Sequence, residues 1–242
     1  MKFRAHESFF IRKGWLYKGM KYVKEDKTVF MGGSGNPMDV LGIGANMVKS
    51  LRYWLQAVEL TKEPPSGKKY QEFTDFGQVV YQNDKYMEEM GTLWLLHYKL
   101  ASNEHLATSW YYFFNEFNRT EFTKDDFVKQ LNAYILLNGE SYSERSLEDD
   151  FNCIINTYIP RSKLNPGKVH PESNIDCPLG ELSLVDIVDK RTKTYRKKTP
   201  KVDSIDPLIV LAIIVDQAEK NEEEGLIKIS TIQNDKKNAG KI

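Results

Sequence analysis

The sequence has few of the features that mark secreted, membrane-spanning or disulfide-bonded proteins. Its two cysteines, Cys153 and Cys177, are too few for a disulfide framework in a chain of 242 residues. The N-terminal segment MKFRAHESFF is charged throughout, which argues against a secretory signal. The longest apolar run, residues 207–215, is far too short to span a bilayer. We therefore expect a reduced, soluble, cytoplasmic protein with no membrane partner.

The sequence also lacks an excess of charge of either sign. Lys plus Arg and Asp plus Glu each number 34, so the net charge gives no sign of an anionic partner. A surface for nucleic acid must therefore be a local patch of the folded protein. No internal repeat or low-complexity tract is visible, and the hydrophobic content of 40% is ordinary for a globular protein.

Helix signals dominate what the sequence does contain. Thr123, followed by acidic residues, predicts the start of a helix, and Gly139 predicts its end. Ser143 and Pro160 bound a second helix in the same way. The apolar stretch within residues 206–219 predicts a buried helix.

From these signals we expect a mainly α fold with two lobes. Residues 1–119 would form a winged helix-turn-helix-like lobe that binds DNA and contains aromatic helices. Residues 120–242 would form a helical C-terminal lobe with a few short strands, one of them basic. The tail KISTIQNDKKNAGKI ends without a core element that closes it, so we expect the natural chain to continue.

The Gly-Ile-Gly turn at residues 42–44 lacks the features of a nucleotide-binding loop. A dinucleotide fingerprint needs a third glycine and a preceding apolar strand. Here GIGANM has no third glycine, and the preceding GNPMDVL is short and polar. The Gly-Lys-Ser/Thr of a Walker A loop is also absent. The turn instead separates a short helical piece, MDVLG, from a helix over residues 45–61, as in a helix-turn-helix.

The longer of these two helices has two faces of different chemistry. At about 100° per residue, one sector is apolar and contains Met47, Val48, Leu51, Trp54, Leu55 and Val58. The opposite side carries Asn46, Lys49, Ser50 and Tyr53. We expect this polar side, together with the neighbouring Arg52, to meet base edges and phosphates in a major groove. A polar helix face that merely lies in water is the alternative.

The segment after this helix is basic and can form a wing. SGKKYQEF, residues 66–73, places Lys68 and Lys69 next to each other. Wings commonly contact the sugar-phosphate backbone, so both lysines are candidate DNA contacts.

A second basic segment, KRTKTYRKKTPK at residues 190–201, holds seven cations among twelve residues and no acid. As a strand it would place Lys193 and Lys197 on one face and Arg196 and Lys198 on the other. These four residues are candidate contacts for a polyanion. A solvated basic loop is the alternative.

Candidate catalytic residues come from the segment HESFFIR, which contains His6, Glu7 and Arg12. A histidine next to a carboxylate can activate water or hold a divalent metal. A nearby arginine can stabilise the charge of a phosphorane. Adjacent side chains point apart on a strand, so a structural role is the alternative. No metal-ligand set is identified, and without CxxC spacing a zinc site is not expected.

Three motifs in order resemble the SspB-like family of bacterial DNA phosphorothioation-associated proteins. They are HESFFIRKGWLYKG, LGIGANMVKSLRYWLQA and GTLWLLHYKLA followed by ATSWYYFFNEF, with DCPLGEL as a later anchor. The resemblance covers residues 1–123 most strongly. It implies a protein that nicks DNA so that sulfur can replace a non-bridging phosphate oxygen. The implied partners are DNA, a cysteine desulfurase, an ATP-pyrophosphatase sulfurtransferase and an ATPase. No catalytic residue is carried over from it, because no His-Asn-His, PD-(D/E)xK or GIY-YIG nuclease signature is present.

The sequence therefore favours a DNA nicking endonuclease that depends on Mg²⁺ or Mn²⁺ and uses no organic cofactor. A non-catalytic DNA-binding adaptor that positions separate modification enzymes is the alternative. A third hypothesis is a protein scaffold whose aromatic helices dock a partner. The aromatics within residues 110–117 could also stack the bases of an unpaired strand, but five consecutive aromatics point all round a helix, so most of them should lie in the core.

Overall fold

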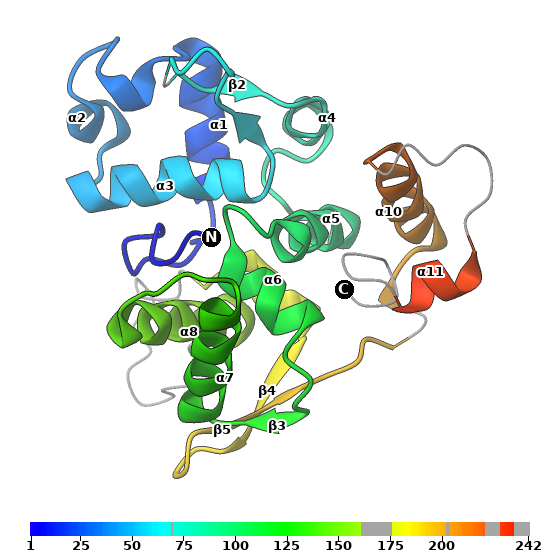
Figure 1. Cartoon of the computed structure of the whole chain (residues 1–242). Coiled ribbons are helices and arrows are strands. Elements are labelled where there is room, and N and C mark those ends of the chain that lie inside the picture. Colours follow the sequence, from blue (N-terminus) through cyan, green and yellow to red (C-terminus); the bar gives the residue numbers. More distant parts are fainter. Residues whose placement is uncertain (69, 161–175, 202–203, 221–227, 235–242) are drawn as a thin grey trace.

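The computed structural model describes residues 1–68, 70–160, 176–201, 204–220 and 228–234, and it is mainly helical with short strands (Figure 1). The helices are α1 Trp15–Glu25, α2 Pro37–Leu41, α3 Ala45–Ala57, α4 Asp75–Asn83, α5 Met90–Ser102, α6 Thr108–Asn115, α7 Lys124–Leu137, α8 Glu144–Tyr158, α10 Pro207–Lys220 and α11 Ile229–Asn234. The strands are β1 Thr61–Lys62, β2 Glu72–Phe73, β3 Glu121–Phe122, β4 Val185–Asp189 and β5 Thr194–Lys197. The prediction of a mainly α fold with a few short strands is confirmed.

The strands form two small antiparallel sheets at opposite ends of the molecule (Figure 1). In the first sheet β1 pairs with β2, with Thr61 opposite Phe73. In the second sheet the order is β3-β5-β4, so β5 is central. Tyr195 of β5 lies between Phe122 of β3 and Ile187 of β4. This second sheet packs beside α7 and α8 (Figure 1). Because β5 is part of the basic segment 190–201, that segment lies there too.

The helix ends follow the local signals of the sequence. The side chain of Thr123 accepts a hydrogen bond from the backbone N–H of Asp126, whose carboxylate accepts the N–H of Thr123 in return. This capping box satisfies backbone donors that the helix itself leaves unpaired. Gly139 follows α7 with a φ of 75°, a left-handed conformation that glycine adopts without strain. Ser143 caps α8 by accepting the N–H of Ser146.

The buried hydrophobic residues form one core that extends from the N-terminal helices to the second sheet. The aromatic helix α6 lies within this core. Trp110 and Phe113 of α6 are almost completely buried, and Trp110 meets Trp54 of α3 edge to face at 5.3 Å between ring centroids. Tyr111 and Tyr112 are also buried. Most aromatic side chains of α6 are therefore core residues, and Phe114 is partly buried against the core.

Helix α10 differs from the buried helix that its apolar sequence predicts. Leu208 is 70% exposed, and Leu211 is 54% exposed. The helix lies at one side of the molecule and packs mainly against α5 (Figure 1). Lys99 of α5 holds it there through an ion pair with Asp216 at 2.7 Å. Among the described residues, α5 packs on one face of α10, and Leu208 and Leu211 lie exposed away from that contact.

The two cysteines are buried and not bonded to each other. Burial raises the pKa of the Cys177 thiol to about 12 and that of Cys153 well above its usual value. Both thiols therefore stay neutral and act as packing residues. Within the described ranges, every helix is too short or too polar to cross a membrane.

Candidate nucleic-acid interface

The segment from α2 to β2 forms two helices joined by a glycine turn and followed by a hairpin. Asn36 caps α2 by accepting the N–H of Met38, and Gly42 ends it in a left-handed conformation with a φ of 61°. Helix α3 then begins after Gly44, whose backbone is extended and which offers no side-chain cap. Helix α1 packs closely on α3, because a Cβ placed on Gly19 would lie 2.7 Å from Cδ1 of Leu55.

At the N-terminal end of α3, two predicted DNA-contacting residues face solvent. Asn46 is exposed, and the side chain of Lys49 is 63% exposed. The nearest carboxylate to the Lys49 ammonium is Glu7, with Nζ and Oε1 3.8 Å apart. An ion pair of this length and exposure is worth less than about 1 kcal/mol, so Lys49 can exchange it for a phosphate at little cost.

Ser50 and Tyr53, by contrast, are buried, and the prediction that they face solvent is wrong. Ser50 is 0% exposed and donates a hydrogen bond to the carbonyl oxygen of Phe9 at 3.3 Å. Tyr53 is 7% exposed and donates to the carbonyl oxygen of Leu106 at 3.0 Å. Burial raises the pKa of the Tyr53 hydroxyl well above its usual value. The N-terminal segment, which lies along this side of α3 (Figure 1), supplies the carbonyl oxygen of Phe9, and Leu106 just before α6 supplies the other. A polar helix face can therefore be buried.

Arg52 is also held by the fold. Its guanidinium donates to the carboxylate of Glu63, with Nε 3.0 Å from Oε1. The same oxygen accepts the side-chain amides of Gln56 and Gln71, each at 3.0 Å. Gln71 is completely buried and accepts a hydrogen bond from Thr61. This network ties α3 to the β1–β2 hairpin, and Arg52 serves in it as a structural cation.

In the loop of this hairpin, Lys68 is exposed, as a wing residue should be. Lys69 lies outside the residues that the structure describes.

His6 lies deep in the core, which does not fit a direct role in DNA chemistry. Its ring is 1% exposed and stacks on Trp54 with an interplanar angle of 15°. Nε2 of His6 lies 2.7 Å from Oδ1 of Asp150 on α8. The carboxylate of Asp150 also accepts the hydroxyl of Ser109 at 2.5 Å and the backbone N–H of Arg4 at 2.8 Å. His6 therefore joins the N-terminal segment to α6 and α8.

Glu7 and Arg12 have different partners from His6. Glu7 adopts a φ of 50° and directs its carboxylate toward Lys49 at the surface. Arg12 rests on two rings, 5.1 Å from the centroid of Trp15 and 5.6 Å from that of Phe9. Such cation–π contacts orient the guanidinium. The proposed catalytic group of His6, Glu7 and Arg12 is thus divided between core and surface.

In the basic segment near β5, Lys197 is committed to the fold. Its ammonium donates to the carbonyl oxygens of Phe113 and Phe117 at the end of α6. It also lies 4.7 Å from the centre of the Phe113 ring. A cation at the carbonyl end of a helix satisfies unpaired acceptors and the helix dipole. The prediction that Lys197 contacts DNA therefore conflicts with its position.

The other basic residues of this segment are exposed. Arg196 pairs with Glu121 across the strands, with Nε 3.0 Å from Oε1. Lys198 lies 3.8 Å from Asp186. Lys193 does not lie on the strand, since it belongs to the β4–β5 turn and has a φ of 54°. These three side chains stay candidate phosphate contacts.

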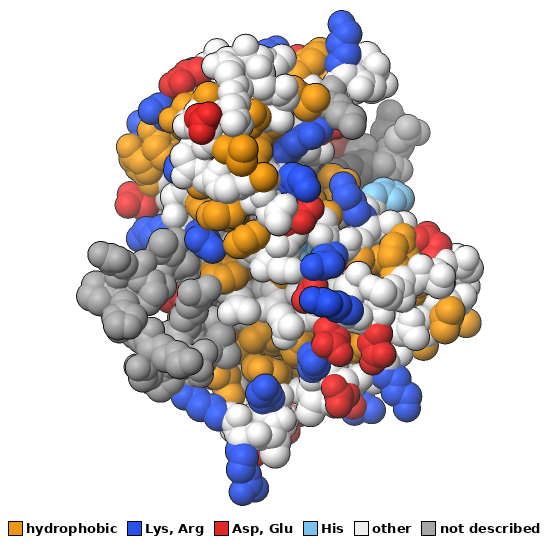
Figure 2. Space-filling view, turned by 90° about the vertical axis from the view of Figure 1, so that its left-hand side faces the viewer, with side chains coloured by type: hydrophobic (Ala, Val, Ile, Leu, Met, Phe, Trp, Pro, Cys, Tyr) orange, Lys and Arg blue, Asp and Glu red, His pale blue; other side chains and the backbone are white. Residues whose placement is uncertain are grey.

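The surface at the N-terminal end of α3 is mixed in charge. Figure 2 shows the side of the molecule on which this end lies, with Lys and Arg side chains interspersed with Asp and Glu. A continuous basic patch is not visible on this face. Contact with DNA there would depend on a few local cations, as the net charge of zero predicts.

Comparison with protein families identifies the family of this chain. Residues 3–242 match the family model described as "Protein of unknown function (DUF4007)". The chain belongs to this family. No curated protein matches it.

Two solved structures are similar to this DUF4007 chain over almost its whole length. A crystal structure of SspB with magnesium ion bound has a TM-score of 0.87 and 28% sequence identity, and the match covers 99% of this chain and 72% of that one. A second SspB crystal structure has a TM-score of 0.86 and 26% identity with the same coverage. The resemblance to an SspB-like family is confirmed.

The described parts of this DUF4007 chain contain no group of three or more His, Cys, Asp or Glu side chains that could hold a metal ion. Magnesium often keeps several waters and binds through one or two carboxylates and a substrate phosphate. The described residues therefore assign no ligand set.

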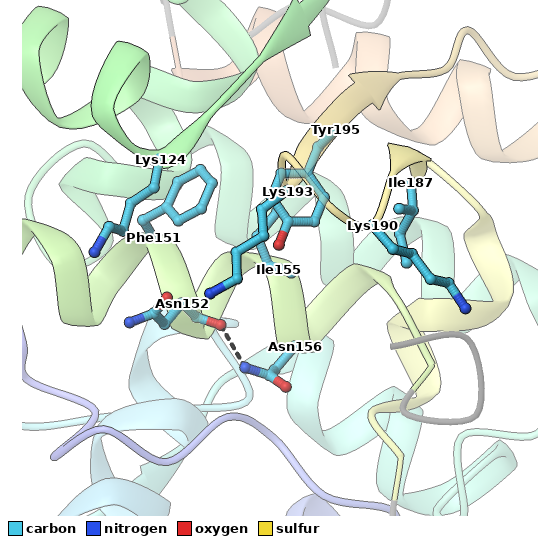
Figure 3. Close-up of a pocket in the computed structure, with 9 residues that line it drawn as sticks. All are labelled: Lys124, Phe151, Asn152, Ile155, Asn156, Ile187, Lys190, Lys193 and Tyr195. Atoms are coloured by element: carbon cyan, nitrogen blue, oxygen red, sulfur yellow. Dashed lines mark hydrogen bonds between the residues drawn. The ribbon is translucent and has the colours of Figure 1, made fainter. Parts of the chain in front are cut away.

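One cluster of polar residues forms only in the folded structure and is not predicted by any sequence pattern above. A cavity of about 420 Å³ lies between α8 and the β4–β5 hairpin, lined in part by Lys124, Asn152, Asn156 and Lys190 (Figure 3). Asn152 and Asn156 are four residues apart on one helix and so share a face. That spacing is a local signal, but nothing local indicates that the basic turn lies opposite.

Proposed function

We propose that this chain binds DNA and nicks one strand as a step of phosphorothioate modification in a bacterial defence or modification system. The observation that supports the proposal is the likeness to SspB, at 28% identity and over 99% of the chain. In such a system the partners would be a cysteine desulfurase, an ATP-pyrophosphatase sulfurtransferase and an ATPase. A fold by itself does not assign an activity, so the proposal needs a direct test.

For DNA contact we propose the N-terminal end of α3, with α2 and the hairpin completing a winged helix-turn-helix. Gly44 leaves the first backbone N–H groups of α3 without a side-chain cap, and the first turn contains no acid. Such a helix end attracts a phosphate. Asn46 and Lys49 lie in the same turns and face solvent. Lys68 in the hairpin loop would contact the adjoining backbone.

A second contact would come from the β4–β5 hairpin at the opposite end of the molecule (Figure 1). Lys193, Arg196 and Lys198 are exposed there. Arg196 pairs with Glu121 and Lys198 with Asp186, and ion pairs with single exposed carboxylates are weak and can give way to phosphates.

A divalent ion, Mg²⁺ or Mn²⁺, would supply Lewis-acid assistance to phosphodiester cleavage. The described residues do not assign its ligands, so we attribute no catalytic step to it. Glu7 remains a candidate for orienting Lys49 through their ion pair, and Arg12 for contacting a phosphate. His6 would act through the fold, because its ring has no path to a phosphodiester.

The test is relaxation of supercoiled plasmid by the purified protein in the presence of Mg²⁺ or Mn²⁺, with EDTA as the control. Accumulation of nicked circles supports the endonuclease. The variants Glu7→Gln and Arg12→Lys should reduce nicking while duplex binding on a gel persists. Absence of nicked circles with either ion, at protein concentrations that shift the duplex completely, contradicts the enzymatic proposal.

The burial of His6 favours a second candidate, a DNA-binding adaptor without catalysis of its own. Such an adaptor would retard duplex DNA on a gel and leave supercoiled plasmid intact. Its affinity should fall steeply with salt, because bound phosphates release counterions. Negligible affinity at low salt would contradict both candidates.

A further inference from the structure

We propose that the cavity between α8 and the β4–β5 hairpin binds a single nucleotide, with its base or sugar on an apolar floor and its phosphate among lysines. The ligand is a nucleoside monophosphate, either free or as an unpaired unit of a DNA strand. This site lies apart from α3 and does not depend on nicking. The free-nucleotide form of the proposal needs no DNA contact at all.

The cavity has the size of a small-ligand site. Its volume of about 420 Å³ lies within the range of roughly 300–1,000 Å³ typical of small-molecule pockets. Such a space accommodates one nucleotide and excludes a duplex. Its walls come from the start of α7, one face of α8 and the β4–β5 hairpin (Figure 3), so a ligand would contact three elements distant in sequence.

The floor is aromatic and aliphatic. Phe151 and Ile155 of α8 are 2% and 4% exposed and form its base, and the half-buried side chains of Ile187 and Tyr195 supply the apolar surface that a ligand can reach. Tyr195 meets Phe151 at 5.8 Å between ring centroids, with the rings inclined at 67°. Flat apolar walls of this kind bind the face of a base or sugar, and base–aromatic contact stabilises binding by about 1–3 kcal/mol.

The rim is cationic, and the residues that line the cavity include no acid. Lys190 and Lys193 form no ion pair within the part of the chain that the structure describes, whereas Lys124 pairs with Glu148 at 2.9 Å. In Figure 3 the ammonium groups of Lys124 and Lys193 lie toward the same end of the cavity, near Asn152, and that of Lys190 points away at the other end. The end with two ammonium groups is therefore the phosphate position.

Hydrogen-bonding groups inside the cavity are left for a ligand. Asn156 donates to the backbone carbonyl oxygen of Asn152 at 2.6 Å, which holds its side chain in place. The amide of Asn152 and the hydroxyl of Tyr195 have no hydrogen-bond partner among the described residues. The hydroxyl points from β5 toward α8 (Figure 3). Burial raises the pKa of Tyr195, so this group stays a neutral donor. A half-buried donor without a partner favours a polar ligand.

The experiment is calorimetric titration of the full chain with a deoxynucleoside 5′-monophosphate, with the deoxynucleoside and with inorganic phosphate. The monophosphate should bind saturably and at least tenfold more tightly than either fragment, because only it contacts both floor and rim. The variant Lys193→Glu should weaken binding at least tenfold, and Tyr195→Phe about fivefold, since it removes one hydrogen bond. The control Lys129→Glu makes the same charge change at an exposed position outside the cavity.

A second titration distinguishes the two sources of the nucleotide. It uses a duplex with one unpaired nucleotide and the matched fully paired duplex. Preference for the unpaired duplex that disappears in Lys193→Glu and Tyr195→Phe supports a nucleotide within a strand. Saturable monophosphate binding without that preference supports a free nucleotide. The proposal is overturned if the protein shows neither of these two responses, or if it binds the monophosphate and inorganic phosphate equally. The duplex affinity of Lys49→Glu reports on α3 separately.

Discussion

Nε2 of His6 lies 2.7 Å from Oδ1 of Asp150, and both side chains are about 1% exposed. The two residues are 144 positions apart, so the contact closes the N-terminal segment over α8. That segment in turn supplies the carbonyl oxygen of Phe9 to Ser50 and to the indole N–H of Trp54. The position of α3, and with it the candidate DNA surface, depends on this buried polar contact.

Asp150→Ala should therefore destabilise the protein. The substitution leaves the hydroxyl of Ser109, the backbone N–H of Arg4 and the ring of His6 without their acceptor in a buried site. We expect the free energy of unfolding to fall by about 3–5 kcal/mol, measured by denaturant titration. Asp125→Ala, on the exposed first turn of α7, should cost less than about 1 kcal/mol. A small effect of Asp150→Ala would contradict the structural role given to His6.

Lys49→Glu should weaken duplex binding severalfold or more and leave thermal stability nearly unchanged, because the side chain is 63% exposed. The slope of log affinity against log salt should fall by about one if a single phosphate contact is lost. Fluorescence anisotropy at several salt concentrations measures both quantities. Lys129→Glu again provides the matched charge change at a distance. Unchanged affinity would remove α3 from the interface.

Tyr53→Phe should affect stability and leave DNA binding intact. The hydroxyl donates to the carbonyl oxygen of Leu106. Loss of this hydrogen bond should lower the free energy of unfolding by about 0.5–1.5 kcal/mol. Leu51→Ala, at a completely buried position of the same helix, should cost about 2–5 kcal/mol. Equilibrium unfolding and anisotropy on the same samples separate the two properties. A Tyr53→Phe protein of normal stability that no longer binds duplex would restore Tyr53 as a DNA contact.

Lys197→Met should destabilise the protein by about 1–3 kcal/mol, because two carbonyl oxygens at the end of α6 lose their donor. Arg196→Met should have little effect on stability, since its pair with Glu121 is exposed. If both residues contacted DNA equally, the two variants would lose affinity equally. We expect Arg196→Met alone to lose affinity without loss of stability, as judged by thermal unfolding and anisotropy.

Acid should weaken the start of α7 through Asp126. Hydrogen bonds from the backbone and the hydroxyl of Thr123 lower the pKa of this carboxyl below its value in the unfolded chain. Its contribution is thus fully present above the unfolded pKa and is lost as the pH falls through the lower, folded one. Asp126→Asn should lower the free energy of unfolding by about 1 kcal/mol at neutral pH. The variant should also lose less stability than the parent protein when the pH is lowered. A parallel pH profile for both proteins would contradict this assignment.

The sequence by itself determined both ends of α7, the start of α8 and the glycine turn, whereas the helix expected over residues 45–61 ends at Ala57. Thr123, Gly139 and Ser143 act on backbone groups within about three residues of themselves, so their effect is readable locally. The apolar side of α3 was likewise readable, because helical periodicity fixes which side chains share a face. The likeness to the SspB family was also visible in the order of the motifs.

Only the tertiary structure decided which polar residues face water. Ser50, Tyr53, His6 and Lys197 find their partners 41, 53, 144 and 84 positions away. A polar side chain can be buried wherever a distant segment supplies a hydrogen-bonding group, and no pattern within one helix or strand records that segment. The same reason hid the cavity between α8 and the β4–β5 hairpin, whose lysines and asparagines meet only after folding.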